Sequence, residues 1–177
     1  MDQPASEHSL KVVLLGDGSV GKTSSLHRYI DGKFQDVYSP TMGVDILHQE
    51  VTIDDKKVNL QFWDIGGQDH FAKIRTRFYR NASLGLLVFD VTNKASFDHL
   101  DGWVAECYDN LKREIPLVLV GNKIDLVNLR MITSSQVEEW IANSRAKVVA
   151  WFETSAYTGV NVLEAFHRLA KEGTKHL

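Results

Sequence analysis

The sequence has 177 residues, of which 44% are hydrophobic and 24% charged, the ordinary balance of one globular domain. Its formal net charge of -3 gives no basic surface of the kind that nucleic-acid binding usually needs, and its single cysteine, Cys107, excludes an intramolecular disulfide. The polar N-terminal stretch MDQPASEHS and the lack of a long apolar run argue against a signal peptide and a membrane span. We therefore expect a soluble protein of a reducing compartment.

Strands and helices are predicted to alternate along the chain. In chain order, the pattern predicts a strand at 10–16, a helix at 21–30, a hairpin of strands 44–53 and 58–64, a strand at 84–90, a helix at about 94–112, a strand at 116–122, a helix at about 134–145, a strand at 147–153 and a helix at about 161–172. Continuous Val/Leu strands separated by amphipathic helices predict an α/β fold with a six-stranded, mostly parallel sheet. Helices should cover both faces, and one hairpin strand should be antiparallel.

The stretch GDGSVGKTS, from Gly16 to Ser24, lies between the first strand and the first helix. That context makes the pattern GxxxxGK[ST] a phosphate-binding loop, because glycines let backbone N–H groups surround phosphate oxygens at a helix N-terminus. Lys22 would reach the β- and γ-phosphates, and Thr23 would offer its hydroxyl to Mg²⁺. A glycine-rich turn that matches by chance is the weaker alternative. The predicted phosphate-binding residues are Gly16, Gly18, Ser19, Val20, Gly21, Lys22, Thr23 and Ser24.

The stretch GNKID at 121–125 indicates which base is bound. It follows the strand PLVLV and so lies at the carboxyl end of the sheet, where ligands of such folds bind. Its Asn-Lys-x-Asp pattern resembles the guanine-specificity motif of GTP-binding proteins, in which a carboxylate, here Asp125, accepts from the ring N–H and the exocyclic amine. The stretch TSA at 154–156 resembles the loop that contacts the guanine oxygen. The predicted base-binding residues are Asn122, Lys123, Asp125, Ser155, Ala156 and Tyr157.

Two further segments resemble the nucleotide-sensing switches of small GTPases of the Ras superfamily: YSPTMGVD at 38–45 and WDIGGQDHF at 63–71. The resemblance covers about residues 9 to 172 and implies the three-layer P-loop GTPase fold, or G domain. The Rab branch matches best, through the segments MGVDI, NLQFWDIGG, GQDHF, FYRNA and LVFDVT. The segment WDIGGQ is similar to the corresponding segment of divergent Rab-like proteins.

The resemblance implies a role for each matching residue. Gln68 would orient the attacking water, and Lys22 and Thr41 would complete the catalytic set. Mg²⁺ would be held by Thr23, Thr41 and, through water, Asp64. Gly67 would contact the γ-phosphate, Phe34 would pack on guanine, and Tyr38 would complete the nucleotide contacts. The bound nucleotide would be GTP or GDP.

Several residues depart from the Rab pattern. Gly66 stands where alanine is usual, and the pair Gly66–Gly67 predicts a loop that is poorly preorganised around Gln68. His70 replaces an arginine, Tyr157 a lysine, and the order Gly18-Ser19 replaces Ser-Gly.

The resemblance also implies partners: an exchange factor, a GTPase-activating protein and GTP-dependent effectors. Effectors would contact the switches and a surface of Ile46, Trp63 and Phe78, where Ile46 replaces a phenylalanine. Strand alternation places Trp63 opposite Phe62 and its neighbours, so we expect it to be exposed, whereas Trp103, Trp140 and Trp151 should pack in or near the core. A monomer is expected.

The whole chain, 1–177, is expected to form one G domain, with a flexible N-terminus at about 1–9 and the start of a C-terminal tail at about 173–177. Rab proteins attach to membranes through prenylated C-terminal cysteines, whereas this sequence ends in KEGTKHL, so either membrane attachment uses a tail that is not present here or the protein is not prenylated. We expect a cytoplasmic location, with the cytoplasmic face of an endomembrane as a further option. The segment from Phe34 to Thr41 contains no arginine or lysine, which predicts slow intrinsic hydrolysis.

Three functions are compatible with these motifs. The first is a switch that hydrolyses GTP and regulates vesicle traffic. The second is a constitutive GTP-binding scaffold with negligible hydrolysis, and the third is a P-loop phosphotransferase that acts on a small acceptor. Gln68 and Thr41 favour the first over the second, because a scaffold needs neither. The Asn-Lys-x-Asp motif disfavours the third.

Overall fold

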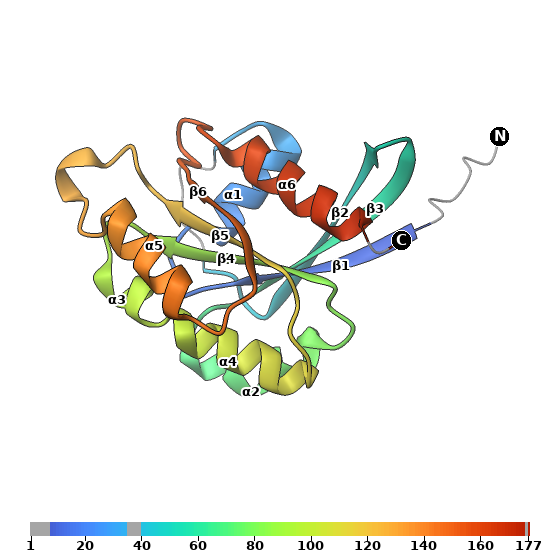
Figure 1. Cartoon of the computed structure of the whole chain (residues 1–177), viewed down its shortest axis with the longest axis horizontal. Coiled ribbons are helices and arrows are strands. Elements are labelled where there is room, and N and C mark those ends of the chain that lie inside the picture. Colours follow the sequence, from blue (N-terminus) through green and yellow to red (C-terminus); the bar gives the residue numbers. More distant parts are fainter. Residues whose placement is uncertain (1–7, 35–39, 176) are drawn as a thin grey trace.

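The computed structural model describes residues 8–34, 40–175 and 177, and it contains one six-stranded sheet in the order β2-β3-β1-β4-β5-β6 (Figure 1). The strands are β1 (His8–Leu15), β2 (Val44–Ile53), β3 (Lys56–Ile65), β4 (Leu84–Asp90), β5 (Leu117–Asn122) and β6 (Val148–Glu153). Strand β2 runs antiparallel to β3, and every other pair is parallel. The predicted fold class is therefore confirmed.

The helices cover both faces of this sheet. Helices α1 (Lys22–Asp31) and α6 (Val162–Thr174) lie on one face. The other face carries α4 (Leu100–Leu111) and α5 (Ser134–Asn143), with the short α2 (Ala72–Arg75) and α3 (Lys94–Asp98) beside them. Figure 1 shows this three-layer arrangement, with α6 crossing above the strands and α4 below them.

Local sequence explains the hairpin. Asp54 and Asp55 form its two-residue turn, and both have positive φ, at 47° and 64°. Two consecutive left-handed residues match the right-handed twist of the flanking strands, and Asp tolerates this conformation better than most residues. The turn fixes the register, in which Ile53 faces Lys56 and Ile46 faces Trp63.

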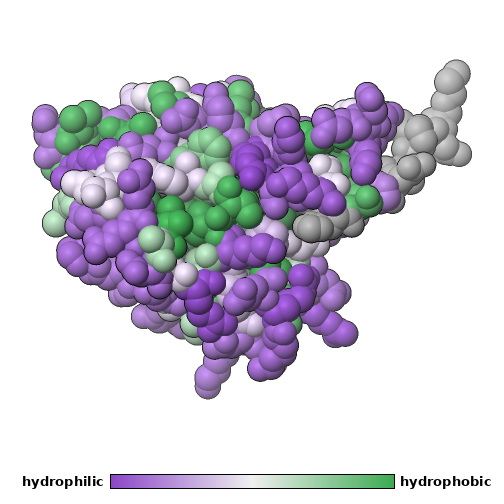
Figure 2. All heavy atoms as spheres, in the orientation of Figure 1, coloured by the Kyte–Doolittle hydropathy of each residue, from purple (hydrophilic) through white to green (hydrophobic). Residues whose placement is uncertain are grey.

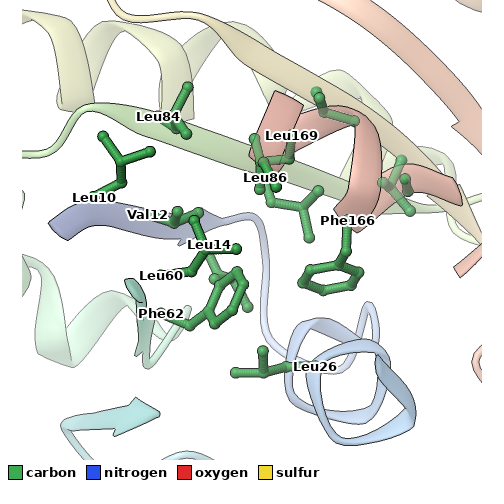
Figure 3. Packing of buried hydrophobic residues seen from close by; sticks show 14 of the residues in the cluster. Leu10, Val12, Leu14, Leu26, Leu60, Phe62, Leu84, Leu86, Phe166 and Leu169 are labelled. Carbon is green, nitrogen blue, oxygen red and sulfur yellow. The ribbon is translucent and has the colours of Figure 1, made fainter. Parts of the chain in front are cut away.

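The core consists of two apolar layers, one on each face of the sheet. Along β1, Val12 and Leu14 face the layer beneath α1 and α6, whereas Val13 and Leu15 face the layer beneath α4. Figure 3 shows the first layer, where Phe166 of α6 reaches between the strands and Leu26 of α1. The ring of Phe166 stacks on Tyr29 at 4.5 Å between ring centroids and meets Phe62 edge-on at 5.5 Å.

The structure differs from the sequence prediction at four places. The predicted helix at 94–112 is broken at His99 into α3 and α4. A short helical segment, Asp69–Tyr79, which contains α2 between two 3-10 turns, was not predicted. Strand β1 already includes His8 and Ser9, which were expected in a flexible tail. Helix α6 continues to Thr174, so its last turn occupies the start of the expected C-terminal tail.

Trp103, Trp140 and Trp151 pack in or against the second core layer, as predicted. Among the residues that the structure describes, no helix combines the length and the apolar character that crossing a bilayer requires. The face seen in Figure 2 is largely hydrophilic, with an apolar patch near its centre and smaller ones elsewhere.

The aromatic contacts of α6 predict a large stability effect. We expect Phe166→Ala to lower the free energy of unfolding by about 3–5 kcal/mol, because it removes a buried ring and leaves a cavity. Leu163→Ala, on the same helix but 59% exposed, should change it by less than about 0.5 kcal/mol. Urea denaturation of both variants measures this difference, and equal effects would contradict the placement of Phe166 in the core.

Candidate functional site

A cavity of about 440 Å³ lies at the carboxyl ends of the parallel strands, where the loops after β1, β3, β5 and β6 converge. Such an edge is the usual ligand site of α/β sheets. The cavity brings together most of the predicted site residues. Its lining comprises Gly18, Ser19, Gly21, Lys22, Thr23, Ser24, Phe34, Thr41, Gly67, Gln68, Asn122, Lys123, Asp125, Leu126, Ala156 and Tyr157.

The phosphate loop depends on two glycines that no other residue could replace without strain. Gly16 has φ +142°, and a Cβ there would lie 2.2 Å from the carbonyl oxygen of Val88. Gly21, the N-cap of α1, has φ +98° and would clash with Asn122 in the same way. Ser19 also adopts a left-handed conformation, with φ 67°, which favours glycine. The exchanged order Gly18-Ser19 therefore places the strain on a serine.

Lys22 is buried beneath this loop, with 6% of its surface exposed. Its Nζ donates to the carbonyl oxygens of Gly16 at 2.6 Å and Asp17 at 2.8 Å, so the ammonium group is held at the centre of the loop. Burial lowers the pKa of Lys22 to about 8, although the Asp64 and Asp17 carboxylates oppose the shift. A buried cation of this kind is stabilised by an anion that enters the cavity.

Asn122 joins three segments around the cavity. Its Nδ2 donates to the carbonyl oxygen of Val20 at 3.0 Å, and its Oδ1 accepts from the Ala156 N–H at 3.0 Å and the Thr154 hydroxyl at 3.1 Å. Lys123 adds a second tie, because its Nζ donates to the Ser19 carbonyl at 2.7 Å. The same Nζ also pairs with Asp90 at 2.8 Å.

Asp125 and two aromatic rings form the end of the cavity predicted to hold a base. The Ser155 hydroxyl donates to Asp125 Oδ1 at 2.7 Å and so orients the carboxylate. Phe34 and Tyr157 meet edge-on at 5.2 Å between ring centroids. Leu126 also lines this end. Sequence analysis missed Leu126, although its position directly after the motif that ends at Asp125 was a usable signal.

Three oxygen-bearing side chains meet beside Lys22. The Thr23 hydroxyl lies 2.9 Å from that of Thr41 and donates to Asp64 Oδ2. Asp64 is 1% exposed, and its Oδ1 has no hydrogen-bond partner among the described residues. Burial raises the pKa of Asp64, while Thr23 and Lys22 oppose the shift. Hard oxygen ligands with one carboxylate oxygen unpartnered fit a magnesium ion, which prefers such donors.

The loop after β3 lies directly against the phosphate loop. A Cβ on Gly67 would lie 2.4 Å from the Gly16 carbonyl oxygen, and a Cβ on Gly66 would lie 2.7 Å from the Thr41 carbonyl oxygen. The Gly66 N–H donates to the Gly43 carbonyl at 2.8 Å. Both glycines therefore serve close backbone approach, and the poor preorganisation expected around Gln68 stays a prediction. Gln68 lies beside Gly18, where an added Cβ would contact Gln68 Cγ at 3.5 Å.

Comparison with known proteins gives the family. The family model described as "Ras family" matches residues 11–175, nearly the whole chain. The chain belongs to the Ras family. It is 39% identical over 169 residues to the Ypt/Rab-type GTPase ypt7 of Schizosaccharomyces pombe, with 93% of this chain and 82% of the relative covered. It is equally similar, 39% over 172 residues, to the Ras-related protein Rab7 of Pisum sativum, with 94% of this chain and 82% of that protein covered.

A third relative, the GTP-binding protein yptV5 of Volvox carteri, is 39% identical over 172 residues, with 94% of this chain and 83% of the relative covered. The chain is therefore a Rab-type small GTPase of the Ras family, as the sequence motifs indicated. Membership in a family of GTPases favours the hydrolysing switch over the constitutive scaffold and the phosphotransferase.

Some residues expected to contact nucleotide in this GTPase do not line the cavity. Val20 packs in the core, Ser155 is fully buried and acts on Asp125, and Asp64 lies behind Thr23. Gly16 also lies outside the lining and contributes its carbonyl oxygen to Lys22. Tyr38 falls outside the described residues.

The expected effector surface of the GTPase is only partly exposed. Ile46 is 43% exposed and faces Trp63 across the hairpin. Trp63 lies on the opposite face of β3 from Phe62, as predicted, but it is half-buried. Phe78 packs on it at 5.8 Å between ring centroids, and Lys11 Nζ lies 3.6 Å over its ring. The exposure predicted for Trp63 is therefore wrong, because the face opposite the first core layer is itself covered.

Sequence analysis also missed the side chains that fasten the phosphate loop to α4. Asp17 accepts from Trp103 Nε1 at 2.7 Å and from His99 Nδ1 at 2.6 Å. The hydrogen bond to Asp17 and its charge raise the pKa of His99, which is 60% exposed at its side chain. The carboxylates of Asp69 and Asp98 act in the same direction.

The raised pKa of His99 predicts a pH-dependent contribution to stability. A folded-state pKa above the unfolded value gives stability that is fully present below about pH 6.5 and is lost as the pH rises through the raised pKa. We expect His99→Gln to lower the free energy of unfolding of the GDP-bound protein more at pH 6 than at pH 9. The difference should be small, because the ring is exposed.

Urea denaturation at both pH values measures this effect. In an Asp17→Asn background the pH dependence of the His99→Gln effect should become smaller, since the largest contribution to the raised pKa of His99 is gone and only the weaker Asp69 and Asp98 charges are left. An unchanged pH dependence in that background would show that Asp17 is not the group responsible.

Proposed function

We propose that the cavity binds GTP and GDP, with the phosphates on the loop Gly16–Ser24 and guanine between Phe34 and Tyr157. The observation that carries this proposal is that the Asn122–Asp125 motif and the buried Lys22 line one cavity. Asp125, oriented by Ser155, would accept from the two adjacent donors of guanine. Adenine lacks that donor pair and would leave the carboxylate unsatisfied, at a cost of about 1–3 kcal/mol.

The residues around Lys22 suit the phosphate chain and its metal ion. Lys22 would turn from the Gly16 and Asp17 carbonyls toward phosphate oxygens, and the α1 N-terminus would add its partial positive charge. Thr23 and Thr41 would hold Mg²⁺ directly and Asp64 through water, with the unpartnered Asp64 Oδ1 as acceptor. When bound, Mg²⁺ neutralises charge on the transferring phosphoryl group.

Hydrolysis would then depend on Gln68, which lines the cavity next to Gly18. Its side-chain amide can orient a water by accepting a hydrogen bond at Oε1 and donating one from Nε2. Gly67 would contact the γ-phosphate through its N–H, so loss of that phosphate would release the loop. The segment between Phe34 and Thr41 brings no cation to the site, which leaves charge on the leaving group incompletely neutralised.

At the level of the cell, we propose a Rab-type switch in membrane trafficking, built on a single G domain over 1–177. Exchange factor, activating protein and effectors would contact the two switches and the partly exposed surface of Ile46, Trp63 and Phe78. Trp63 and Phe78 already pack together, which supports a shared contact surface. The domain would act as a monomer in the cytoplasm and at the cytoplasmic face of an endomembrane.

The base assignment is tested at Asp125. Asp125→Asn should weaken GDP binding by about 10- to 100-fold, since a hydrogen bond to a charged group contributes about 1.5–3 kcal/mol. It should also shift preference toward xanthine nucleotides, because the new amide nitrogen donates to the xanthine oxygen. Competition titration with GDP and XDP measures both effects. Asp109→Asn, exposed on α4, serves as the control, and unchanged GDP affinity in Asp125→Asn would refute the assignment.

The catalytic assignment is tested by single-turnover hydrolysis. We expect a slow intrinsic rate, on the order of one turnover per hour, that a partner's arginine accelerates by about 10³–10⁵-fold. Gln68→Leu should lower both the intrinsic and the stimulated rate while leaving GDP affinity within about twofold. If the wild-type domain, without any partner, hydrolyses GTP faster than about once per second, the inference from the absence of an arginine or lysine between Phe34 and Thr41 is wrong.

A further inference from the structure

The switch segment that follows Gln68 carries a buried arginine. Arg75, at the end of α2, is 5% exposed and forms a two-pronged ion pair with Glu106 of α4. Its Nε donates to Glu106 Oε1 at 2.6 Å and its Nη2 to Oε2 at 2.8 Å. The remaining nitrogen, Nη1, donates to the main-chain carbonyl of Gln68 at 2.9 Å. One guanidinium group therefore connects α4 to the backbone of the predicted water-orienting residue.

The same guanidinium group is tied indirectly to the phosphate loop. Arg75 lies over the ring of Trp103, 4.4 Å from the ring centroid. The indole N–H of Trp103 donates to the Asp17 side chain at 2.7 Å, and the Asp17 carbonyl accepts from Lys22 Nζ at 2.8 Å. Trp103 thus contacts the phosphate loop with its edge and the switch arginine with its face.

The environment keeps this group charged and fixed. Glu106 neutralises it and also accepts from the Tyr79 hydroxyl. Burial and the Glu106 carboxylate raise the pKa of Tyr79, which keeps that hydroxyl protonated as a donor. The planar, bidentate geometry cannot be matched by a lysine, whose single ammonium group would not reach both Glu106 and Gln68.

We propose that Arg75, held by Glu106 and stacked on Trp103, is a positioning residue for GTP hydrolysis that fixes the main chain of Gln68 relative to the phosphate loop. This inference rests on the proposed role of Gln68 in orienting the attacking water. The need for such a tether follows from the sequence next to Gln68. Gly66 and Gly67 have no side chains with which to hold the loop, so its position is set by contacts from outside, of which Arg75 supplies one.

A displaced Gln68 would affect the chemical step and not the affinity. Small displacements of positioned groups lower rates by up to about 100-fold. The base end of the cavity, at Asp125, lies on different loops and shares no contact with Arg75. Loss of the tether should therefore lower the single-turnover rate while leaving GTP and GDP affinity within about twofold.

The experiment measures single-turnover hydrolysis by the full chain, loaded with GTP and started with Mg²⁺, in Arg75→Lys and Glu106→Gln. We expect each to lower the rate by about 10-fold. Arg75→Lys keeps a cation beside Glu106 and so preserves the fold even if Glu106→Gln, which leaves a buried charge unpaired, does not. The matched control is Glu172→Gln. Glu172 likewise accepts from an arginine and a second donor, Arg168 at 2.7 Å and Lys175 at 2.7 Å, but on α6. The Glu172→Gln variant should hydrolyse GTP at the wild-type single-turnover rate.

Each single change is repeated in a Gln68→Leu background. If Arg75 acts through Gln68, Arg75→Lys should lower the rate no further there, because coupled residues are not additive. A wild-type rate in Arg75→Lys, or an equal loss in both backgrounds, overturns the inference and leaves the proposed function intact. A normal rate in Gln68→Leu alone overturns the role of Gln68 and the inference together.

Discussion

The amide of Asn122 is the interaction on which the geometry of the cavity depends. It donates to the loop after β1 and accepts from two groups of the loop after β6, while its own backbone ends β5. The loops after β1 and β6 are far apart in sequence, and the Val20 carbonyl and the Ala156 N–H would lose this hydrogen-bond partner without it. The same side chain explains the glycine at position 21, since an added Cβ there would lie 2.2 Å from Asn122 Nδ2. In the proposed function, the phosphate-binding and base-binding parts of the cavity would thus share one side chain.

The cavity also concentrates buried charge. Lys22 and Asp64 are each more than nine-tenths buried. Burial lowers the pKa of Lys22 and raises that of Asp64, so it favours the neutral form of each. Burying opposite charges costs desolvation that their mutual attraction repays only when further partners are present. Under the proposed function, a polyanion accompanied by a divalent cation would supply those partners to both residues at once. Its binding would then complete the electrostatics of the domain, and the switch loops would respond to one phosphate group.

The parts of the structure that could be predicted are those encoded by local pattern. The strands 44–53 and 84–90 were predicted to the residue, because alternation and continuous apolar runs are strong short-range signals. Motif spacing likewise predicted the lining of the cavity. The contacts of Arg75 and Trp103 could not be predicted, since they join elements that only the tertiary fold brings together. The exposure of Trp63 was predicted wrongly for the same reason. Alternation predicts which face of a strand a side chain lies on, but not whether Phe78 and Lys11 cover that face.

The order of the sheet has a consequence for how the chain folds during synthesis. Strand β1 pairs on one side with β3, from His8 opposite Val58, and on the other with β4, from Val12 opposite Leu84. Both partners emerge from the ribosome long after β1, and pairings between distant segments form slowly. The β2–β3 hairpin, closed by Asp54 and Asp55, needs only local contacts and forms on a microsecond scale of about 1–10 μs. The apolar segment LKVVLL therefore has no partner strand until β3 and β4 have been synthesised. During that interval it is an unpaired apolar strand of the nascent chain and is open to association with other chains.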